Sequence, residues 1–447
     1  MSAICSSNIT AGFVDLATFD ELEKYMYGGP HATAYFVRET TKATWFTQVP
    51  VVLSRASGQP GFDTEFSVSI SRAGDYLLST WLRLTTPALT ARDAEDPEQS
   101  LRIRWTRNLM HNLIREACIS FNDLTAARFD NYHLDFWSAF TVPAGKRTGY
   151  NNMIGNIDAL TQPSTSLPAT TLNLPLPFFY TRDSGVALPT AALPYNEMRI
   201  TICTRRWEEL LVVDVDSGPG PVARQAVSGD VKETPTLKDV QVWANYAIVS
   251  NDERQMMGCG ARDMLIEQVQ TGTRQTYLAG GDSRPRFDLR FSHAIKALFF
   301  GVRNTTVPSE WSNYTSHTPA LTSDSVDFGG ADMVDPIQAT SLIYENTTRL
   351  SAMGSDYFSL VNPYYHAPSI PLETGYHMYS YSLDFVCLDP MGSTNYGKLT
   401  NVSIVPEASQ AAQTGQSDDG QSYEFITTVV NNNVIRIAGG ALGFPVL

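Results

Sequence analysis

The segment "TEFSVSISRAGDYLL" (residues 64–78) has a counterpart, "PRFDLRFSHAIKALF" (residues 285–299), in the second half of the chain. Phe66 aligns with Phe287, and the other matching positions follow at the same offset of 221 residues. In both segments apolar side chains recur at every second position, which is the period of a half-buried β-strand. The pair therefore predicts that the chain contains the same β-structure twice.

Two further pairs of segments extend the repeat. "WFTQV" (45–49) aligns with "LIEQV" (265–269) at an offset of 220 residues, and "ISFND" (119–123) aligns with "LIYEN" (342–346) at an offset of 223. Any two segments with strand-like alternation could align by chance. Chance alignment would not place three pairs of segments in the same order and at nearly the same offset. We interpret the pattern as a tandem duplication of one all-β domain of about 200 residues.

Each repeat is long enough for about eight strands, which favours a sandwich or a barrel because both arrangements hide sheet edges from solvent. The repeat also predicts how the chain is divided. We expect an N-terminal arm at 1–42, a first repeat at 43–250 with a loop excursion at 214–230, a short helical linker at 251–262 and a second repeat at 263–447.

Alternating apolar residues predict the individual strands. Residues 65–70 and 76–84 are separated by the short segment "SRAG", which predicts a β-hairpin. Further strands are expected at 113–121, 197–204, 239–249, 264–270, 286–303, 340–345, 379–387, 400–405 and 423–437.

Helical signals are few and short. Thr18 and Glu21 form a capping-box pattern before a helix that should stop at Gly28, and Ser250 with Glu253 forms another. A third helix is expected at 129–140. The first of these helices carries an apolar stripe that needs a covering surface, made by Phe19, Leu22 and Met26.

Composition limits the classes of function. The chain has 447 residues, of which 43% are hydrophobic and 17% charged, and its net charge is −14. So acidic a chain is poorly suited to binding nucleic acid or an anionic membrane through its overall field. Five cysteines without a CxxC pair indicate reduced thiols, and the N-terminus lacks a secretory signal pattern, so we expect the chain to be made in the cytosol.

The triplet Asp-Ser-Gly occurs twice, beginning at Asp183 and at Asp216. Aspartic proteases use two such carboxylates that share one proton, with one triplet in each lobe. Here both triplets fall in the first repeat, and Arg182 directly precedes one of them. Since Asp-Ser-Gly is also a common turn composition, we interpret both triplets as turns.

Other searches for chemistry give nothing. The sequence contains no GxxxxGK[ST], HExxH or GxSxG motif, and its seven histidines are scattered. We therefore expect no catalytic, cofactor-binding or metal site. Aromatic runs such as "NPYYHAP" (362–368) leave a carbohydrate-binding or glycan-hydrolysing sandwich as the alternative, although packing or a subunit interface is the usual role. Five Asn-x-Ser/Thr sequons are interpreted as ordinary β-rich composition: Asn8, Asn304, Asn313, Asn346 and Asn401.

Several distinctive blocks carry a resemblance to a known family. They include "NLPLPFFYTRDSGVALP" (173–189), "NDERQMM" (251–257), "RFSHAIKALFFGVRN" (290–304), "MGSTNYGKLTNVS" (391–403) and the ending "GFPVL" (443–447). In this order they closely resemble the major capsid protein of iridoviruses, a family of the nucleocytoplasmic large DNA viruses. The resemblance runs from "GFVDLATFDELEKYMYGG" (12–29) to Leu447 and so covers essentially the whole chain.

The resemblance implies an all-β double jelly roll, which is two tandem jelly-roll sandwiches with short accessory helices. It implies a structural protein without enzymatic activity or cofactor, whose homotrimer is a pseudo-hexagonal capsomer of an icosahedral shell over an internal membrane. The implied partners are further copies of the chain, neighbouring capsomers, minor capsid and penton proteins, and the membrane near the N-terminal arm, with no direct contact to nucleic acid. The implied location is the virion shell, with assembly in the host cytoplasm.

Overall fold

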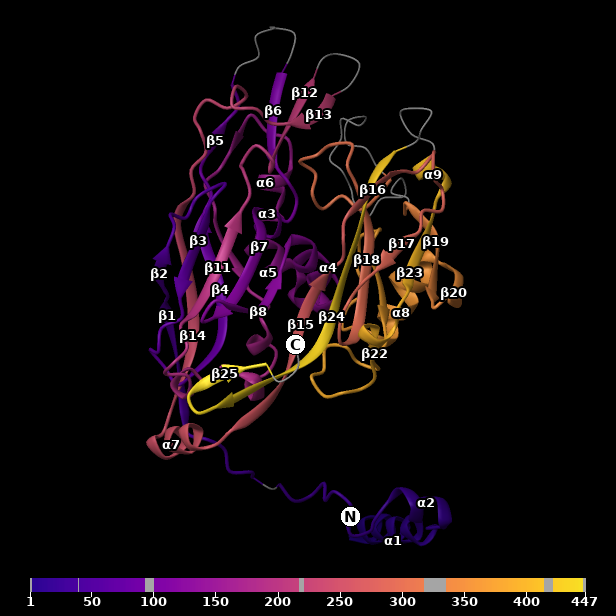
Figure 1. Cartoon of the computed structure of the whole chain (residues 1–447). Helices are drawn as coiled ribbons and strands as arrows, with labels where there is room; N and C mark the ends of the chain where they lie inside the picture. Colours follow the sequence, from indigo (N-terminus) through magenta and orange to yellow (C-terminus); the bar gives the residue numbers. More distant parts are fainter. Residues whose placement is uncertain are drawn as a thin grey trace. The chain divides into compact units, whose positions relative to one another are not determined.

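The computed structural model of the chain describes residues 2–38, 40–92, 100–216, 221–316, 335–413 and 421–444 (Figure 1). By its internal contacts the chain divides into two units, residues 1–45 and residues 46–447, and each is described by itself. Among the described helices, none is long and apolar enough to cross a membrane.

The N-terminal unit contains two helices, α1 (Ser2–Ala17) and α2 (Glu21–Met26). The capping box of α2 is formed by Asp20 and Glu23, so the prediction that Thr18 and Glu21 form it is wrong. The Thr18 hydroxyl instead donates to the carbonyl oxygen of Asp15, at the end of α1. The error arose because α1 was not predicted, and the Thr18 side chain is hydrogen-bonded to the last turn of α1.

The first sandwich is built from two antiparallel sheets. One has the order β1 (Phe46–Val52), β14 (Lys238–Val249), β4 (Tyr76–Thr85) and β10 (Thr171–Pro175). The other has the order β2 (Ser54–Ser57), β3 (Glu65–Ser69), β11 (Met198–Thr204), β7 (Ile114–Phe121) and β8 (Leu124–Phe129). Alternate side chains of both sheets meet in one buried core, which includes Phe66, Leu82, Ile200 and Val242.

The second sandwich is built in the same way. One sheet has the order β15 (Arg262–Thr271), β24 (Ser422–Ala438), β18 (Ala294–Asn304) and β21 (His377–Ser380). The other has the order β17 (Phe287–Leu289), β23 (Val402–Ala408), β19 (Ile337–Tyr344) and β20 (Thr347–Gly354). Between them lies a second core, with the rings of Phe287 and Phe425 stacked 4.1 Å apart.

The main strand orders of the two sandwiches correspond one to one. The exceptions are β2 at the edge of the first sandwich and three short strands that pair with β24 or β18 in the second. Phe66 lies in β3, which pairs with β11. Phe287 lies in β17, which pairs with β23, and β23 has the same position in its sheet as β11. Phe121 and Tyr344 end the corresponding strands β7 and β19. Figure 1 shows the two sandwiches side by side in the unit 46–447, the first in indigo to magenta and the second in orange to yellow.

The predicted hairpin of residues 65–70 and 76–84 is wrong, because β3 and β4 belong to different sheets. The connecting segment crosses from one sheet to the other, and it passes so close to β14 that a Cβ at Gly74 would lie 2.5 Å from the Cβ of Tyr246. The strand expected at 286–303 is likewise divided into β17 and β18, which also lie in different sheets. Alternation identifies the buried face of a strand, but it does not identify the neighbouring strand.

Other predictions need smaller corrections. The strand expected at 379–387 is regular only in β21, at 377–380. The linker helix α7 (Asn251–Cys259) begins after Ser250 as predicted, but the Ser250 side chain makes no capping hydrogen bond. The excursion at 214–230 overlaps the end of β12 (Leu211–Asp216) and contains all of β13 (Pro221–Gln225). These two antiparallel strands join β6 (Ser100–Trp105) in a three-stranded sheet, and residues 217–220 between them lie outside the described residues.

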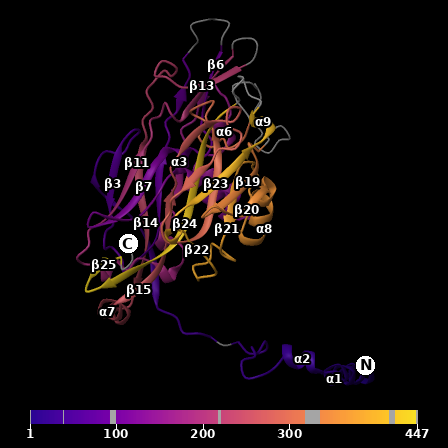
Figure 2. The ribbon, with the colours of Figure 1, turned by 45° about the vertical axis from the view of Figure 1, so that its right-hand side comes forward.

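The remaining helices, more numerous than predicted, and the short strands complete the unit. They are α3 (Leu109–Leu113), α4 (Asn131–Thr141), α5 (Ala144–Ile154), α6 (Asp158–Thr161), α8 (Asn362–His366) and α9 (Gln410–Gln413), the 3₁₀ helices η1 (Phe179–Thr181), η2 (Ser184–Val186), η3 (Thr190–Ala192) and η6 (Tyr396–Lys398), the π-helix η5 (Tyr357–Val361), and the strands β5 (Leu89–Thr90), β9 (Ser166–Leu167), β16 (Gln275–Leu278), β22 (Thr394–Asn395) and β25 (Ala441–Gly443). Figure 1 shows α4, β15 and β24 in the region where the two sandwiches meet, and Figure 2 shows β24 there from a view turned by 45°.

Candidate functional site

The helix α4 joins the two sandwiches. Asp130 caps its N-terminus by accepting a hydrogen bond from the backbone N–H of His133 at 2.9 Å. Phe136 and Phe140 are fully buried, and their ring centroids lie 6.5 and 5.5 Å from that of Phe299 on β18. The contact closes an aromatic cluster that both sandwiches share: Tyr132, Phe136, Trp137, Phe140, Phe299, Tyr314, Tyr376 and Phe385.

Beside this cluster the carboxylate of Asp135 forms a buried polar hub. Its Oδ1 accepts hydrogen bonds from Asn108 Nδ2 (3.1 Å) and His111 Nδ1 (2.7 Å), both in the first sandwich. Its Oδ2 accepts hydrogen bonds from the hydroxyls of Ser312 (2.7 Å) and Tyr314 (2.8 Å), which follow β18 in the second sandwich. Four donors from two segments, one in each sandwich, therefore fix the two sandwiches against each other, since a buried carboxylate left without them would be strongly destabilising.

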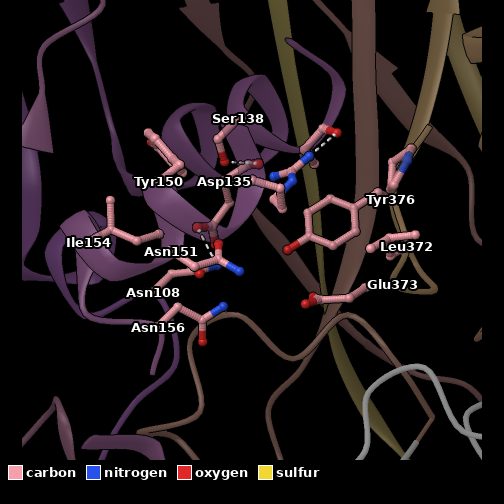
Figure 3. Close-up of a pocket in the computed structure, with 13 residues that line it drawn as sticks. Asn108, Asp135, Ser138, Tyr150, Asn151, Ile154, Asn156, Leu372, Glu373 and Tyr376 are labelled. Carbon is pink, nitrogen blue, oxygen red and sulfur yellow. Dashed lines mark hydrogen bonds between the residues drawn. The ribbon is translucent and has the colours of Figure 1, made fainter. Parts of the chain in front are cut away.

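The hub forms one wall of a small cavity of about 80 Å³. Figure 3 shows Asp135, Asn108 and Tyr150 on one side and Tyr376 and Glu373 on the other. Glu373 pairs with Arg107. Burial raises the pKa values of Tyr150 and Tyr376 and so keeps both phenols neutral. The carboxylate is saturated by its four donors and the neighbouring phenols hold their protons, so the arrangement is suited to holding the chain together rather than to acid–base chemistry.

A second buried cluster connects the sandwiches through ions. Glu267, on β15, pairs with the ammonium group of Lys296 on β18, and its other oxygen lies 3.0 Å from Arg182 Nε. The guanidinium of Arg182 also lies 3.7 Å from the centre of the Trp137 ring on α4. Burial lowers the pKa of Arg182, and the charge of Glu267 opposes that shift. Arg182, which the sequence marked only as the neighbour of Asp183, therefore takes part in the junction.

The first Asp-Ser-Gly triplet opens a single 3₁₀ turn, and the second lies mostly outside the described residues. Asp183 caps η2 by accepting a hydrogen bond from the backbone N–H of Gly185 at 3.2 Å. Asp216 is the last residue of β12, and Ser217 and Gly218 lie outside the described residues.

One histidine and two of the sequons have local structural roles. Burial lowers the pKa of His133 to about 3, with a further contribution from the charge of Arg182. Within the described residues, no group of three His, Cys, Asp or Glu side chains could hold a metal ion. Asn304 and Asn313 are buried, and each accepts a hydrogen bond from the threonine of its own sequon, Thr306 or Thr315.

Sequence reasoning missed the hub, because its members are far apart in the chain and none belongs to a motif. One signal for the ion cluster was present: Lys296 interrupts the apolar segment "AIKALFF" (294–300), and a lone cation in a buried strand requires a buried anion.

Comparisons with known proteins agree with this structural role. A family model described as the N-terminus of the major capsid protein matches residues 34–249, and one described as the large eukaryotic DNA virus major capsid protein matches residues 253–443. The chain is 62% identical to the major capsid protein of Costelytra zealandica iridescent virus over the full length of both proteins. It is 59% identical to that of Invertebrate iridescent virus 6 and 48% identical to that of Lymphocystis disease virus 1, again over both full lengths.

Solved structures share the fold at much lower identity. The chain of PBCV-1 VP54 fitted into a reconstruction of the virophage Sputnik matches with a TM-score of 0.72 at 18% identity, covering 93% of this chain and 100% of that one. The Faustovirus major capsid protein matches with a TM-score of 0.72 at 11% identity, covering 91% and 93%. The fold is thus the double jelly roll, and the relatives are structural proteins rather than proteases or carbohydrate-binding proteins. The chain belongs to the family of large eukaryotic DNA virus major capsid proteins, among those of the iridoviruses.

Proposed function

We propose that three copies of the chain associate around a threefold axis into a pseudo-hexagonal capsomer, and that these capsomers tile the icosahedral shell of the virion. The observation that carries the proposal is the pairing of two sandwiches of equal strand order within one unit, fixed by the Asp135 hub and the α4 cluster. Three such pairs supply six similar blocks, and a ring of six has a hexagonal outline that can cover a large surface.

The proposed division of the chain follows from the same picture. It has an arm at 1–42, a first jelly roll at 43–250 with the excursion at 214–230, a linker at 251–262 and a second jelly roll at 263–447. Arg254 of α7 donates to both carboxylate oxygens of Asp75, at 2.7 and 3.0 Å, next to the start of β4. A linker that is short and anchored in this way favours a fixed placement of the two rolls.

We assign the N-terminal arm to the inner side of the shell, facing the internal membrane. Asp15 is the only charged residue in the sequence of α1, and the described apolar side chains of both helices are exposed. They include Phe13 (67% exposed) in α1, and Leu22 (63%) and Met26 (55%) in α2, whereas Phe19, expected on the same helix as Leu22 and Met26, lies between the two helices. Such a surface needs a lipid or protein cover. Minor capsid and penton proteins would contact the capsomer edges, assembly would take place in the host cytoplasm, and the negative charge of −14 disfavours direct contact with nucleic acid.

Two measurements test this function. Electron microscopy of the full chain at high concentration should show hexagonal units, and a folded chain that forms no such unit would contradict the capsomer. Deleting residues 1–40 should leave hexagonal units intact but abolish flotation with neutral phosphatidylcholine vesicles. Equal flotation of the full and the shortened chain would contradict the role of the arm.

A further inference from the structure

Both sandwiches carry an equivalent row of residues on the face of one sheet that points away from their own core. In the second sandwich Thr271, Thr428, Phe299 and Met378 lie opposite one another across β15, β24, β18 and β21. In the first sandwich the corresponding row across β1, β14, β4 and β10 is Val52, Trp243, Trp81 and Pro175.

A shared irregularity fixes this alignment. The pairing register slips at Leu78 in β4 and at Lys296 in β18, so each strand carries a β-bulge at this point. Trp81 follows the first bulge by three residues, and Phe299 follows the second by three residues. Trp81 is therefore the structural counterpart of Phe299, at an offset of 218 residues, so the sequence offset of 221 that relates Phe66 to Phe287 does not extend into β4 and β18.

In the second sandwich the row is covered by the first sandwich of the same chain. Phe299 and Met378 are completely buried, and the rings of Phe136, Trp137 and Phe140 of α4 pack around Phe299 at centroid distances of 5.5 to 6.5 Å.

In the first sandwich the corresponding row remains on the surface of the chain. Val52 is 42% exposed, Pro175 is exposed, and the half-buried rings of Trp81 and Trp243 stack on each other 6.0 Å apart with an interplanar angle of 12°. Two tryptophans and two aliphatic side chains in one row form an apolar strip, and tryptophan is the residue most often found at the energetic centre of a protein interface.

The second sandwich also carries the counterpart of α4. In the first sandwich α4 follows β8, and in the second η5 and α8 follow β20, which has the same position in its sheet as β8. Leu360, Val361 and Tyr364 have the same i, i+1, i+4 spacing as Phe136, Trp137 and Phe140, but they are 52%, 42% and 70% exposed. A helix face that is buried in one sandwich is thus open in the other.

These two open surfaces cannot meet within one chain. In Figures 1 and 2 α8 lies at the outer edge of the second sandwich, while β14 and β3 lie toward the opposite edge, in the first sandwich. We infer that η5–α8 of one copy packs on the Trp81–Trp243 row of the next copy, and so repeats between copies the contact that α4 makes with Phe299 inside the chain. Such a head-to-tail contact joins two different surfaces and closes into a ring when the rotation allows it. The inference rests on the proposed trimer and names its interface.

Cross-linking tests the contact directly. In a Cys259→Ser background, because Cys259 is an exposed thiol, one tagged chain carries Tyr364→Cys and a differently tagged chain carries Trp243→Cys. The two are co-expressed and treated with a short bismaleimide. We expect a covalent dimer containing both tags, above the background of the parent chain. The matched control replaces Tyr364→Cys by Leu124→Cys, which is 44% exposed at the start of β8, and should give no dimer above background.

A second variant tests the same contact without the cysteine substitutions, in case these impair folding. Tyr364→Asp places a charge in the interface and should convert the trimer to a folded monomer at micromolar concentration, whereas Met256→Asp, on the exposed face of α7, should leave the trimer intact. A trimer that gives no 243–364 cross-link and tolerates Tyr364→Asp would overturn this interface while leaving the capsomer in place. Absence of any trimer from the parent chain would instead overturn the proposed function.

Discussion

Replacing Asp135 by Asn should destabilise the chain more than any surface carboxylate replacement, because this carboxylate accepts four hydrogen bonds at the buried junction. The amide keeps one acceptor oxygen and turns an N–H₂ group toward two of the four donors. A hydrogen bond to a charged group contributes about 1.5–3 kcal/mol. Two are lost and the hydroxyls of Ser312 and Tyr314 recover part of the loss by rotating, so we expect a decrease of about 3–5 kcal/mol, in the range for breaking a buried ionic contact.

Urea unfolding of the full chain, followed by circular dichroism, measures this loss as a lower midpoint at an unchanged slope. The matched control is Asp63→Asn, since Asp63 pairs with Arg206 at 3.0 Å but both side chains are more than half exposed. An exposed pair contributes at most about 1 kcal/mol. If Asp135→Asn lowered the unfolding free energy by no more than Asp63→Asn does, the hub would not hold the sandwiches together and the reasoning would fail.

Three further predictions concern single residues. Phe299→Ala removes a fully buried ring from the α4 cluster and should lower the unfolding free energy by about 3–5 kcal/mol, while loss of under 1 kcal/mol in the same urea titration would show that the cluster is not packed as described. The pKa of His133 is about 3 in the folded chain, below its ordinary value near 6.5, so the folded state resists protonation and stability should fall as pH decreases from about 6.5 toward 3. His133→Phe should flatten the stability profile in this range by up to about 1.4 kcal/mol per pH unit, and an unchanged profile would contradict the neutral buried imidazole. Asp183→Asn replaces the charged turn-capping acceptor by an amide oxygen and should cost about 1 kcal/mol or less, without loss of any pepstatin-sensitive cleavage. Such a cleavage in the parent chain, abolished in the variant, would restore the protease hypothesis.

The sequence was sufficient to predict the duplicated β-fold, because alternation and the matching segments are local signals. In β3 and β17 it predicted buried residues correctly, as Phe66 and Phe287 show. It could not predict that β3 and β4 enter different sheets, since the same alternation fits a hairpin and a crossover equally well. In β4 the expected residues Thr80, Leu82 and Leu84 are buried, but the bulge at Leu78 buries Leu77 in place of the expected Tyr76 and Leu78.

The junction was less accessible to sequence reasoning. The Asp135 hub joins residues 177 and 179 positions apart in the chain, and nothing local indicates that Ser312 and Tyr314 approach α4. The helix itself was predicted from its aromatic residues, but its role was not, because burial between two domains looks the same in a sequence as burial within one. Lys296 is the residue whose type alone demanded a buried anion, which is Glu267 of the same sandwich, and Arg182 then connects Glu267 to the first sandwich.

The mass of the purified full chain at nanomolar concentration tests the central claim most directly. Interfaces of obligate assemblies are large and apolar, often above about 2,000 Å², so the assembly should survive dilution. Mass photometry should therefore record a single species of three times the 49.3 kDa of the chain. A folded species of 49.3 kDa that persists at micromolar concentration would contradict the account of this chain as the subunit of a trimeric capsomer.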